Sequence, residues 1–589
     1  MKITLPLAAG MILVIIAGCA SNTDDKTAYN PNKEITPPAA TIEMDQIAPV
    51  EDRAEAQAAL LEDQPFIDVI DPYLAQAAPH KFKKAESKRQ VLSPAPYSHT
   101  FMPPTPTEPY PTYYQDEGRE HYAALSQSAV MQVTEQPVST FSIDVDTASY
   151  ANVRRMLNQG ALPPANAVRV EEMINYFDYN YEAPNTLKQP FSIHTELAQA
   201  PWSEHHVLLR VGLKGYAPPA QMRPATNLVF LLDVSGSMNA PNKLPLLKKS
   251  LALLTQQLSE HDSVAIVVYA GASGVVLEPT KGNDRHKILA ALEQLSAGGS
   301  TNGQAGIELA YQLAKQHYLK EGINRVILAT DGDFNVGLSN VDALKALIEH
   351  KRKEGIYLTT LGFGTGNYND ALMETLADHG NGNYAYIDTF SEAQKVLGEQ
   401  LQSTLMTIAK DVKIQVEFNP GVVKEYRLIG YENRTLKRED FNNDLVDAGE
   451  IGAGHTVTAL YELVLHHSPY SVVDPLRYQP NPAATSSLNN ELAFIKFRYK
   501  APEASHSQLL SQAISLPERI PEFEHASESF RFSASVAQFG EALRQSKYVS
   551  TNYEAIIGNA LQAKGTDDLG YRSEFIQLVR LAAKLSRSS

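Results

Sequence analysis

The chain has 589 residues, which is too long for one domain and suggests roughly three to four. Its 67 acidic and 51 basic residues give a net charge of −16, which argues against a nucleic-acid partner, because such a partner requires a basic patch. The apolar share of 43% is ample for buried cores, although this share hides a polar, proline-rich front end.

The first residues have the form of a secretory signal peptide. Lys2 is followed by an apolar run over residues 5–16, which is too short to span a membrane. Ile16-Ala-Gly-Cys19 resembles a bacterial lipobox, whose cysteine becomes the lipid-modified first residue of the mature protein. We therefore expect a lipoprotein signal peptide over residues 1–18 and lipidation at Cys19, with an ordinary cleaved signal as the alternative. Cys19 is the only cysteine, so no internal disulfide is expected.

The residues after Cys19 bear on location and reach. In Gram-negative lipoproteins an aspartate at the next position tends to retain the protein in the inner membrane, whereas this chain has Ala20 and Ser21. By that resemblance we expect a protein lipid-anchored in the bacterial cell envelope, in the outer membrane and facing the periplasm. Residues 19–130 are rich in Pro, Thr, Asp and Tyr and show little hydrophobic periodicity, so we expect a disordered tether.

Residues 131–225 predict a mixed α+β flank. The expected strands are residues 139–146, 191–197 and 206–213, and the expected helices are residues 147–158 and 169–181. Asp144 and Asp146 lie where the first strand ends, and we interpret them as a helix cap rather than a metal site.

Residues 226–405 alternate strand and helix, which predicts an α/β domain with a doubly wound, mainly parallel sheet, Rossmann-like in its layering. The expected strands are residues 228–233, 264–269, 326–330, 357–363 and 384–387, and the expected helices lie near residues 244–258, 285–295, 303–318, 341–351, 371–377 and 391–403.

Three loops of this domain carry oxygen ligands. Asp233-Val-Ser235-Gly-Ser237 follows a buried apolar strand, Thr301 lies in a glycine-rich loop before a helix, and Asp331 follows another apolar strand. The carboxyl ends of parallel strands meet at the edge where α/β folds bind ligands. Carboxylates and hydroxyls without imidazole or thiolate suit a hard divalent cation, Mg²⁺ or Mn²⁺.

This order of Asp-x-Ser-x-Ser, Thr and Asp resembles the metal-ion-dependent adhesion site of the von Willebrand factor type A (VWA) domain, and no position departs from that pattern. The resemblance implies that Ser235 and Ser237 bind the ion directly and that Thr301 binds it directly or through water. It also implies that Asp233 and Asp331 act mainly through water. One coordination position would then remain open for the acidic side chain of a protein partner.

The chain after residue 405 is expected to be β-rich and then helical. Strands are predicted over residues 412–418, 425–431, 456–465 and 491–499, which suggests a sandwich-like body. Because the two ends of an α/β domain of this type lie close together, residues 406–505 should pack with the N-terminal flank across the inserted domain. Residues 506–589 are expected to be helical. The acidic loop over residues 440–450 is interpreted as a solvated turn rather than a calcium loop.

The flanking segments carry a second resemblance. Residues 141–155, 168–172, 175–177, 447–455 and 571–572 are similar to those of the YfbK type of bacterial lipoprotein. This resemblance covers the chain from about residue 138 to its end and indicates architecture and location more readily than a pathway.

The expected function is therefore binding and not catalysis: a lipid-anchored envelope protein that binds a protein partner through a divalent cation. An envelope hydrolase is one alternative, although the chain has neither a Gly-x-Ser-x-Gly nor a His-Glu-x-x-His motif, and the doublets His205-His206 and His466-His467 are interpreted as surface histidines. A structural lipoprotein with a non-functional metal site is the other alternative.

Overall fold

The computed structural model describes residues 120–219, 222–301, 303–332, 341–366, 368–474 and 490–588. The expected signal peptide, the Cys19 lipidation site and residues 19–119 of the expected tether lie outside these residues. Within the described part of the chain, no helix combines the length and apolar character needed to cross a membrane.

The last residues of the expected tether are packed against the fold. Glu120 is only 3% exposed, and its carboxylate lies 2.9 Å from the Arg155 guanidinium. The His121 amide donates to the Tyr368 carbonyl oxygen at 3.0 Å. The prediction of a disordered tether is therefore wrong for residues 120–130, because contacts distant in sequence hold a segment whose own composition is polar.

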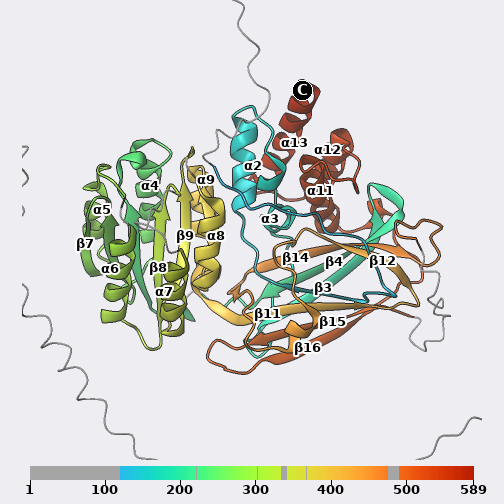
Figure 1. Cartoon of the computed structure of the whole chain (residues 1–589), viewed down its shortest axis with the longest axis horizontal. Helices are drawn as coiled ribbons and strands as arrows, with labels where there is room; N and C mark the ends of the chain where they lie inside the picture. The colour runs from blue at the N-terminus through green and yellow to red at the C-terminus, as the bar shows by residue number, and fades with distance from the viewer. Residues whose placement is uncertain are drawn as a thin grey trace, which may run out of the picture. The chain divides into compact units, whose positions relative to one another are not determined.

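The central domain is built on a six-stranded sheet of order β10-β9-β8-β5-β6-β7 (Figure 1). All its strand pairs are parallel except β6 with β7, which confirms the doubly wound, mainly parallel fold. The strands are β5 (Thr226–Asp233), β6 (Ser263–Tyr269), β7 (Ser273–Lys281), β8 (Ile323–Thr330), β9 (Tyr357–Phe363) and β10 (Tyr384–Ile387).

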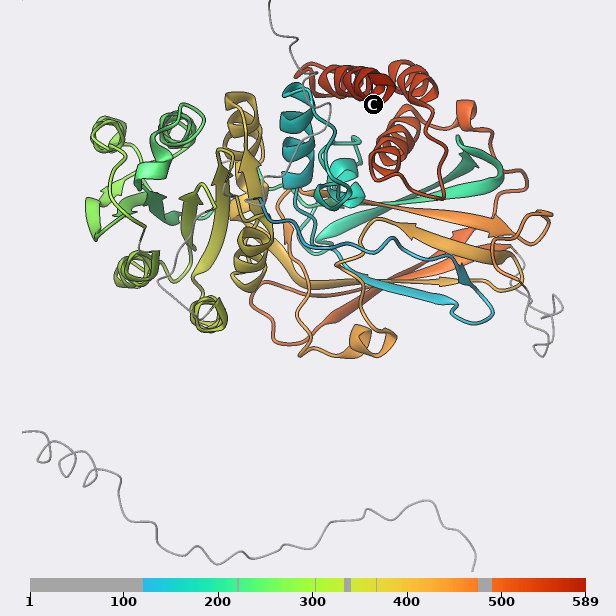
Figure 2. The same ribbon diagram turned by 45° about the horizontal axis from the view of Figure 1, so that its top comes forward.

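Helices cover both faces of this sheet, as Figure 2 shows. Alternate residues of β5 therefore enter opposite cores, with Phe230 in one and Leu231 in the other. The helices are α4 (Leu244–Thr255), α5 (Arg285–Glu293), α6 (Gly303–Gln316), α7 (Val341–Lys353), α8 (Asp370–His379), α9 (Phe390–Gln394) and α10 (Leu401–Leu405), with a π-helical turn at Lys395–Glu399.

The segments before and after the central domain together form a β-sandwich, so the central domain is an insertion in the sequence of this sandwich. One sheet has the order β1-β12-β14-β4-β3, and the other has the order β13-β11-β15-β16, with β2 also pairing with β11. The strands are β1 (Met131–Gln132), β2 (Val138–Ser142), β3 (Phe191–Ala200), β4 (Ser203–Gly215), β11 (Thr407–Phe418), β12 (Val423–Ile429), β13 (Ile451–Gly452), β14 (Thr456–Leu465), β15 (Glu491–Lys500) and β16 (Gln508–Ser515).

Strands from before and after the inserted domain pair directly. Val211 of β4 is opposite Ala459 of β14, and Phe141 of β2 is opposite Ile414 of β11. The expectation that one β-rich body is interrupted by the α/β domain is therefore confirmed. Strand β16, in contrast, falls within residues 506–589, which we expected to be helical; its backbone pairs with β15 and so extends the sandwich.

A helical layer covers the outer face of the first sheet. Tyr461 of β14 packs between the two sheets, whereas its neighbour Leu460 packs against the helices. The layer joins two helices that precede the insertion to the C-terminal segment. Its helices are α2 (Ala148–Asn158), α3 (Val170–Asn175), α11 (Glu528–Leu543), α12 (Tyr553–Gln562) and α13 (Tyr571–Ser588).

Acidic residues interpreted as local features instead connect the body to the central domain. Asp146 accepts a hydrogen bond from the Tyr384 amide at 2.8 Å. Asp144 lies 3.0 Å from the guanidinium of Arg434 in the body, and that guanidinium also lies 2.7 Å from Asp378 of α8 in the central domain. Helix α2 has no side-chain cap, so the interpretation of this pair as a helix cap is wrong. The solvated-turn interpretation of residues 440–450 agrees with the structure, since most of these residues are exposed or half-buried; Asp447, with a 51% exposed side chain, also pairs with Arg352 of α7. Sequence spacing cannot reveal partners so far apart.

Candidate metal site

The first predicted ligand, Asp233, lies at the end of β5 and is fully buried. One carboxylate oxygen accepts from the Ser235 amide at 2.8 Å, and the other accepts from the hydroxyls of Thr330 at 3.0 Å and Tyr269 at 3.3 Å. Burial raises the pKa of Asp233, and the negative charge of Asp331 raises it further, whereas the hydrogen bonds from Ser235 and Thr330 lower it. The carboxylate is thus held in one orientation in a place where negative charge is costly.

The two predicted serine ligands lie side by side. The hydroxyl oxygens of Ser235 and Ser237 are 3.0 Å apart. Ser235 is 2% exposed, whereas Ser237 is exposed. The pair therefore leads from the buried carboxylate to the surface, which is the arrangement required of an ion that also contacts a second protein.

The loop before α6 runs beside the serine loop. The Gly236 amide donates to the Gly299 carbonyl oxygen at 3.0 Å, and the Gly298 amide donates to the Val234 carbonyl oxygen at 2.7 Å. Gly299 has φ +86°, a left-handed conformation that favours glycine. These backbone contacts bring the loop of the half-buried Thr301 alongside the other predicted ligands.

Asp331 follows β8 and is 2% exposed. Its carboxylate accepts a hydrogen bond from the Lys243 ammonium at 2.8 Å. Sequence reasoning missed Lys243, because a lysine directly before an apolar helix is indistinguishable from an ordinary surface lysine. The structure therefore adds a positive charge to the five predicted residues.

The donor set fits a hard divalent cation. It consists of the carboxylates of Asp233 and Asp331 and the hydroxyls of Ser235, Ser237 and Thr301, without nitrogen or sulfur ligands. In the described ranges, no group of three or more His, Cys, Asp or Glu side chains could hold a metal ion. With only two carboxylates, this site depends on hydroxyls and water for the rest of the ion's coordination.

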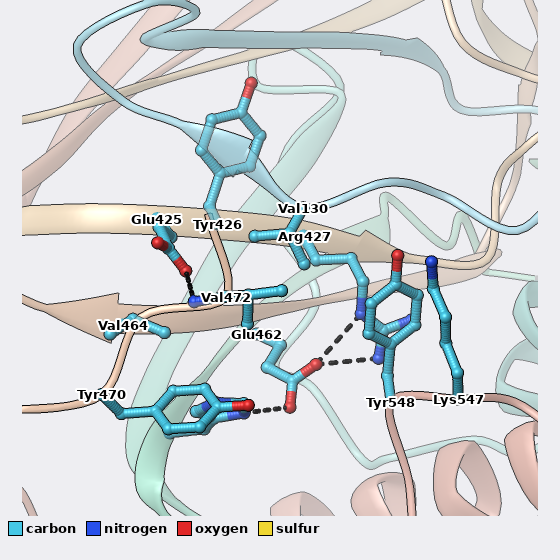
Figure 3. Close-up of a pocket in the computed structure, with 11 residues that line it drawn as sticks. Val130, Glu425, Tyr426, Arg427, Glu462, Val464, Tyr470, Val472, Lys547 and Tyr548 are labelled. Atoms are coloured by element: carbon cyan, nitrogen blue, oxygen red, sulfur yellow. Dashed lines mark hydrogen bonds and ion pairs between the residues drawn. The ribbon is translucent and has the colours of Figure 1, made fainter. Parts of the chain in front are cut away.

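A cavity of about 230 Å³ on the β-sandwich bears on the hydrolase alternative. Figure 3 shows the Glu462 carboxylate directed at the Arg427 guanidinium, with Tyr548 beside it. The central carbon of that guanidinium lies 4.4 Å from the centroid of the Tyr548 ring. His206 also pairs with Glu462 at 2.6 Å and is 9% exposed, so its interpretation as a surface histidine is wrong. Among the described residues, no serine, threonine or cysteine lines the cavity.

Three of the flanking segments that resemble YfbK-type proteins meet at another cavity, of about 510 Å³, which is lined by residues of both the body and the central domain. Phe177, His455 and Arg572 all line it, together with Lys395 from the π-helical turn. Burial and, to a smaller extent, the positive charge of Lys214 lower the pKa of His455 to about 4, so this ring is neutral at pH 7. The resemblance outside the central domain is thus concentrated in space as well as in sequence.

Comparisons with known proteins agree with this architecture. Family models match for "von Willebrand factor type A domain" over residues 227–399, "von Willebrand factor" over residues 116–210 and "Uncharacterized protein YfbK, C-terminal" over residues 403–585. Uncharacterized protein YfbK of Escherichia coli strain K12 is 48% identical over 479 residues, which cover 80% of this chain and 82% of that protein.

More distant similarities concern the inserted domain and its surroundings. Inter-alpha-trypsin inhibitor heavy chain H3 of Homo sapiens is 26% identical over 268 residues, which cover 42% of this chain and 29% of that protein. Among solved structures, a von Willebrand factor type A protein from Catenulispora acidiphila aligns with a TM-score of 0.38 and 14% identity, over 69% of this chain and 91% of that chain.

Proposed function

Because the chain belongs to the YfbK family of proteins with a von Willebrand factor type A domain, we propose that it is a lipid-anchored envelope protein that binds a partner protein through a divalent cation. The residues proposed to hold Mg²⁺ or Mn²⁺ are Asp233, Ser235, Ser237, Thr301 and Asp331. VWA domains typically mediate protein–protein interactions and commonly bind divalent metals. An acidic side chain of the partner is the proposed further ligand.

The observation that carries this proposal is the path of oxygen donors from the buried core to the surface. Asp233 is held by hydrogen bonds from three residues, and the exposed Ser237 hydroxyl lies beside that of the buried Ser235. When bound, the ion supplies a Lewis-acidic centre that attracts a carboxylate. The chain's residues orient the site.

Calorimetric titration of the full-length protein with Mg²⁺ or Mn²⁺ tests the ion site. We expect binding to the wild type and loss of binding in Asp233→Ala. Glu260→Ala is a matched control. The Glu260 side chain is 65% exposed and precedes the amino end of β6, whereas Asp233 lies at the carboxyl end of the neighbouring strand β5. Equal affinity in all three proteins would show that the ion, if bound, is held elsewhere.

The proposed location rests on the lipobox-like residues around Cys19 and on the residues that follow it, and a membrane fractionation experiment tests it. Cys19→Ala should remain with the soluble fraction, because one signal segment and no lipid leave no anchor. Membrane pelleting of this variant at high salt would overturn the proposed anchoring. Separation of inner and outer membranes by density tests the proposed placement in the outer membrane.

Metal-dependent capture tests the proposed partner chemistry. Crosslinking in intact envelopes should yield a specific partner with Mg²⁺ and lose it with EDTA. Ser237→Ala should reduce capture as strongly as EDTA does, because Ser237 is the exposed predicted ligand. Equal capture in the presence of EDTA would instead support a structural lipoprotein whose metal site is non-functional.

A further inference from the structure

Lys243 is a buried cation inside the candidate metal site. It precedes α4, its side chain is 11% exposed, and its ammonium lies 2.8 Å from the Asp331 carboxylate. A lysine side chain normally extends into water, so its enclosure here needs a physical cause.

The loop after β9 supplies that cause. Gly364 has φ +76°, and a Cβ atom at this position would lie 2.3–2.8 Å from three carbons of Lys243. The Tyr386 hydroxyl donates to the Gly364 carbonyl oxygen, and the Gly366 amide donates to Glu120 at 3.2 Å. The loop that covers Lys243 is therefore itself held by β10 and by the body, which keeps the ammonium beside Asp331.

The charges in the site determine what this lysine does. Among the described residues of the site, Asp233 and Asp331 contribute two negative charges, and Lys243 contributes one positive charge. Without the lysine, a divalent ion would bring the site to neutrality. With the lysine, the same ion leaves the site with one positive charge, which the single negative charge of an incoming carboxylate would neutralise.

We propose that Lys243 is a specificity-determining residue of the ion site, which weakens binding of the divalent ion and strengthens binding of a carboxylate to the loaded site. This inference rests on the proposed function, because it names the electrostatic basis on which that site would select an acidic partner. Lys243 would act through its charge on the ion and on Asp331, without coordinating the ion.

Lys243 is proposed to weaken ion binding and to strengthen carboxylate binding. These opposite effects distinguish an electrostatic role of the lysine from a structural one. A positive charge a few ångströms from a divalent ion repels it, and the same charge attracts an incoming carboxylate. At the effective dielectric of a site near the surface, each effect amounts to about tenfold or more in affinity. A residue that merely supports the loop would weaken both steps when it is replaced.

The test uses Mn²⁺ as the ion and acetate as the carboxylate, with the full-length protein in detergent. Electron paramagnetic resonance of free Mn²⁺ measures ion affinity. Water proton relaxation by bound Mn²⁺ then reports the displacement of its water by acetate. Acetamide, a neutral molecule of similar shape, is the control ligand.

We expect Lys243→Met to bind Mn²⁺ about tenfold more tightly and to bind acetate about tenfold more weakly once loaded. Lys243→Arg should behave as the wild type, because it keeps the charge. Lys249→Met, at an exposed position on α4, should also leave both affinities unchanged. Lys243→Gln provides a second neutral variant in case the methionine protein fails to fold.

Several outcomes would overturn the inference. Weaker binding of both Mn²⁺ and acetate in the neutral variants would show that Lys243 only supports the site. Tighter Mn²⁺ binding with unchanged acetate affinity would limit the lysine to competition with the ion. Absence of Mn²⁺ binding in the wild type would overturn the proposed ion site and this inference together. The other two results differ from it because in them the wild type still binds Mn²⁺.

Discussion

The junction between the central domain and the body differs from the candidate metal site in how buried charge is compensated. At the junction, the Arg154 guanidinium lies 2.9 Å from Asp388 and 2.7 Å from Glu392, and all three side chains are at most 5% exposed. At the metal site, the Lys243 ammonium pairs with the buried Asp331 carboxylate, whereas the buried Asp233 carboxylate accepts hydrogen bonds from amide and hydroxyl groups. Each junction carboxylate thus lies against a positive charge, whereas Asp233 is held by neutral donors and keeps a negative charge that an ion can take up.

The junction repeats this pairing in other places. The Arg169 guanidinium lies 2.5 Å from Asp370 and 2.9 Å from Glu374, both in α8 of the central domain. An apolar contact accompanies the ion pairs, since Ala148 and Ala151 of α2 share a small core with Tyr384 of β10. Helix α2 thus covers the edge strand of the inserted domain, which would otherwise present unpaired backbone groups.

The largest expected effect concerns the junction. Arg154→Met should lower the free energy of unfolding by about 3–5 kcal/mol, because it leaves the buried carboxylates of Asp388 and Glu392 without their partner. Thermal melting and chemical denaturation measure this loss. Glu574→Gln is the matched control: this carboxylate also lies 3.1 Å from Arg154 but is 37% exposed, so we expect a loss of at most about 1 kcal/mol. Equal losses in both variants would break the comparison.

A smaller effect on stability is expected from Glu171, a buried residue of α3. Among the described residues, no arginine lies within ion-pair distance of its carboxylate. It is 2% exposed, and one of its carboxylate oxygens has no hydrogen-bond partner among the described residues. Burial and, to a smaller extent, the negative charges of Glu432 and Glu172 raise the pKa of Glu171 to about 7. In the folded protein this carboxyl group is therefore protonated at mildly acidic pH.

The sign of the resulting pH dependence follows from linkage. The raised pKa stabilises the fold fully below about pH 4.5, and this contribution is lost as pH rises through about 7. Its size is about 3 kcal/mol, since the pKa rises from 4.5 to about 7 and each pKa unit corresponds to about 1.4 kcal/mol. Glu171→Gln should remove this component, so that the variant gains stability over the wild type above pH 7. Glu182→Gln, at an exposed position, should keep the wild-type profile; the same profile in Glu171→Gln would contradict the assignment.

Some of the fold and the site is predictable from sequence because the signals are local. Strand β5 is apolar throughout and ends in Asp233, and the serines follow it at fixed spacing. The insertion was also predictable, since strands lie on both sides of an α/β domain whose ends are close together. Strand β7 was missed because its face is partly exposed and it contains Pro279, so its pattern is weaker than that of the buried strands.

The interactions that place the domains were not predictable, because they join residues far apart in the chain. Arg154 and Asp388 are separated by 234 positions, and nothing near either residue indicates the other. The same holds for Lys243 and Asp331, separated by 88 positions. A local motif identifies the ligands, whereas the charges that tune them arise only from tertiary packing.

The smallest effect on stability, and the sharpest test of the contrast between the two regions, is expected from Thr301→Ala. Thr301 is half-buried in a glycine-rich loop and belongs to neither core of the central domain, so its truncation should cost less than about 0.5 kcal/mol without metal. With Mg²⁺ the wild type should gain stability, by about 2.7 kcal/mol at a hundredfold excess over its Kd. A tenfold weaker site in the variant would reduce this gain by about 1.4 kcal/mol.

Thermal melting with and without Mg²⁺ measures both quantities. The control is Thr375→Ala, because Thr375 is another half-buried threonine of the central domain. If Thr301→Ala lost stability without metal and kept the full gain with Mg²⁺, this loop would be structural like the junction. The contrast between carboxylates paired with a cation and carboxylates held by neutral donors would then not locate the ion.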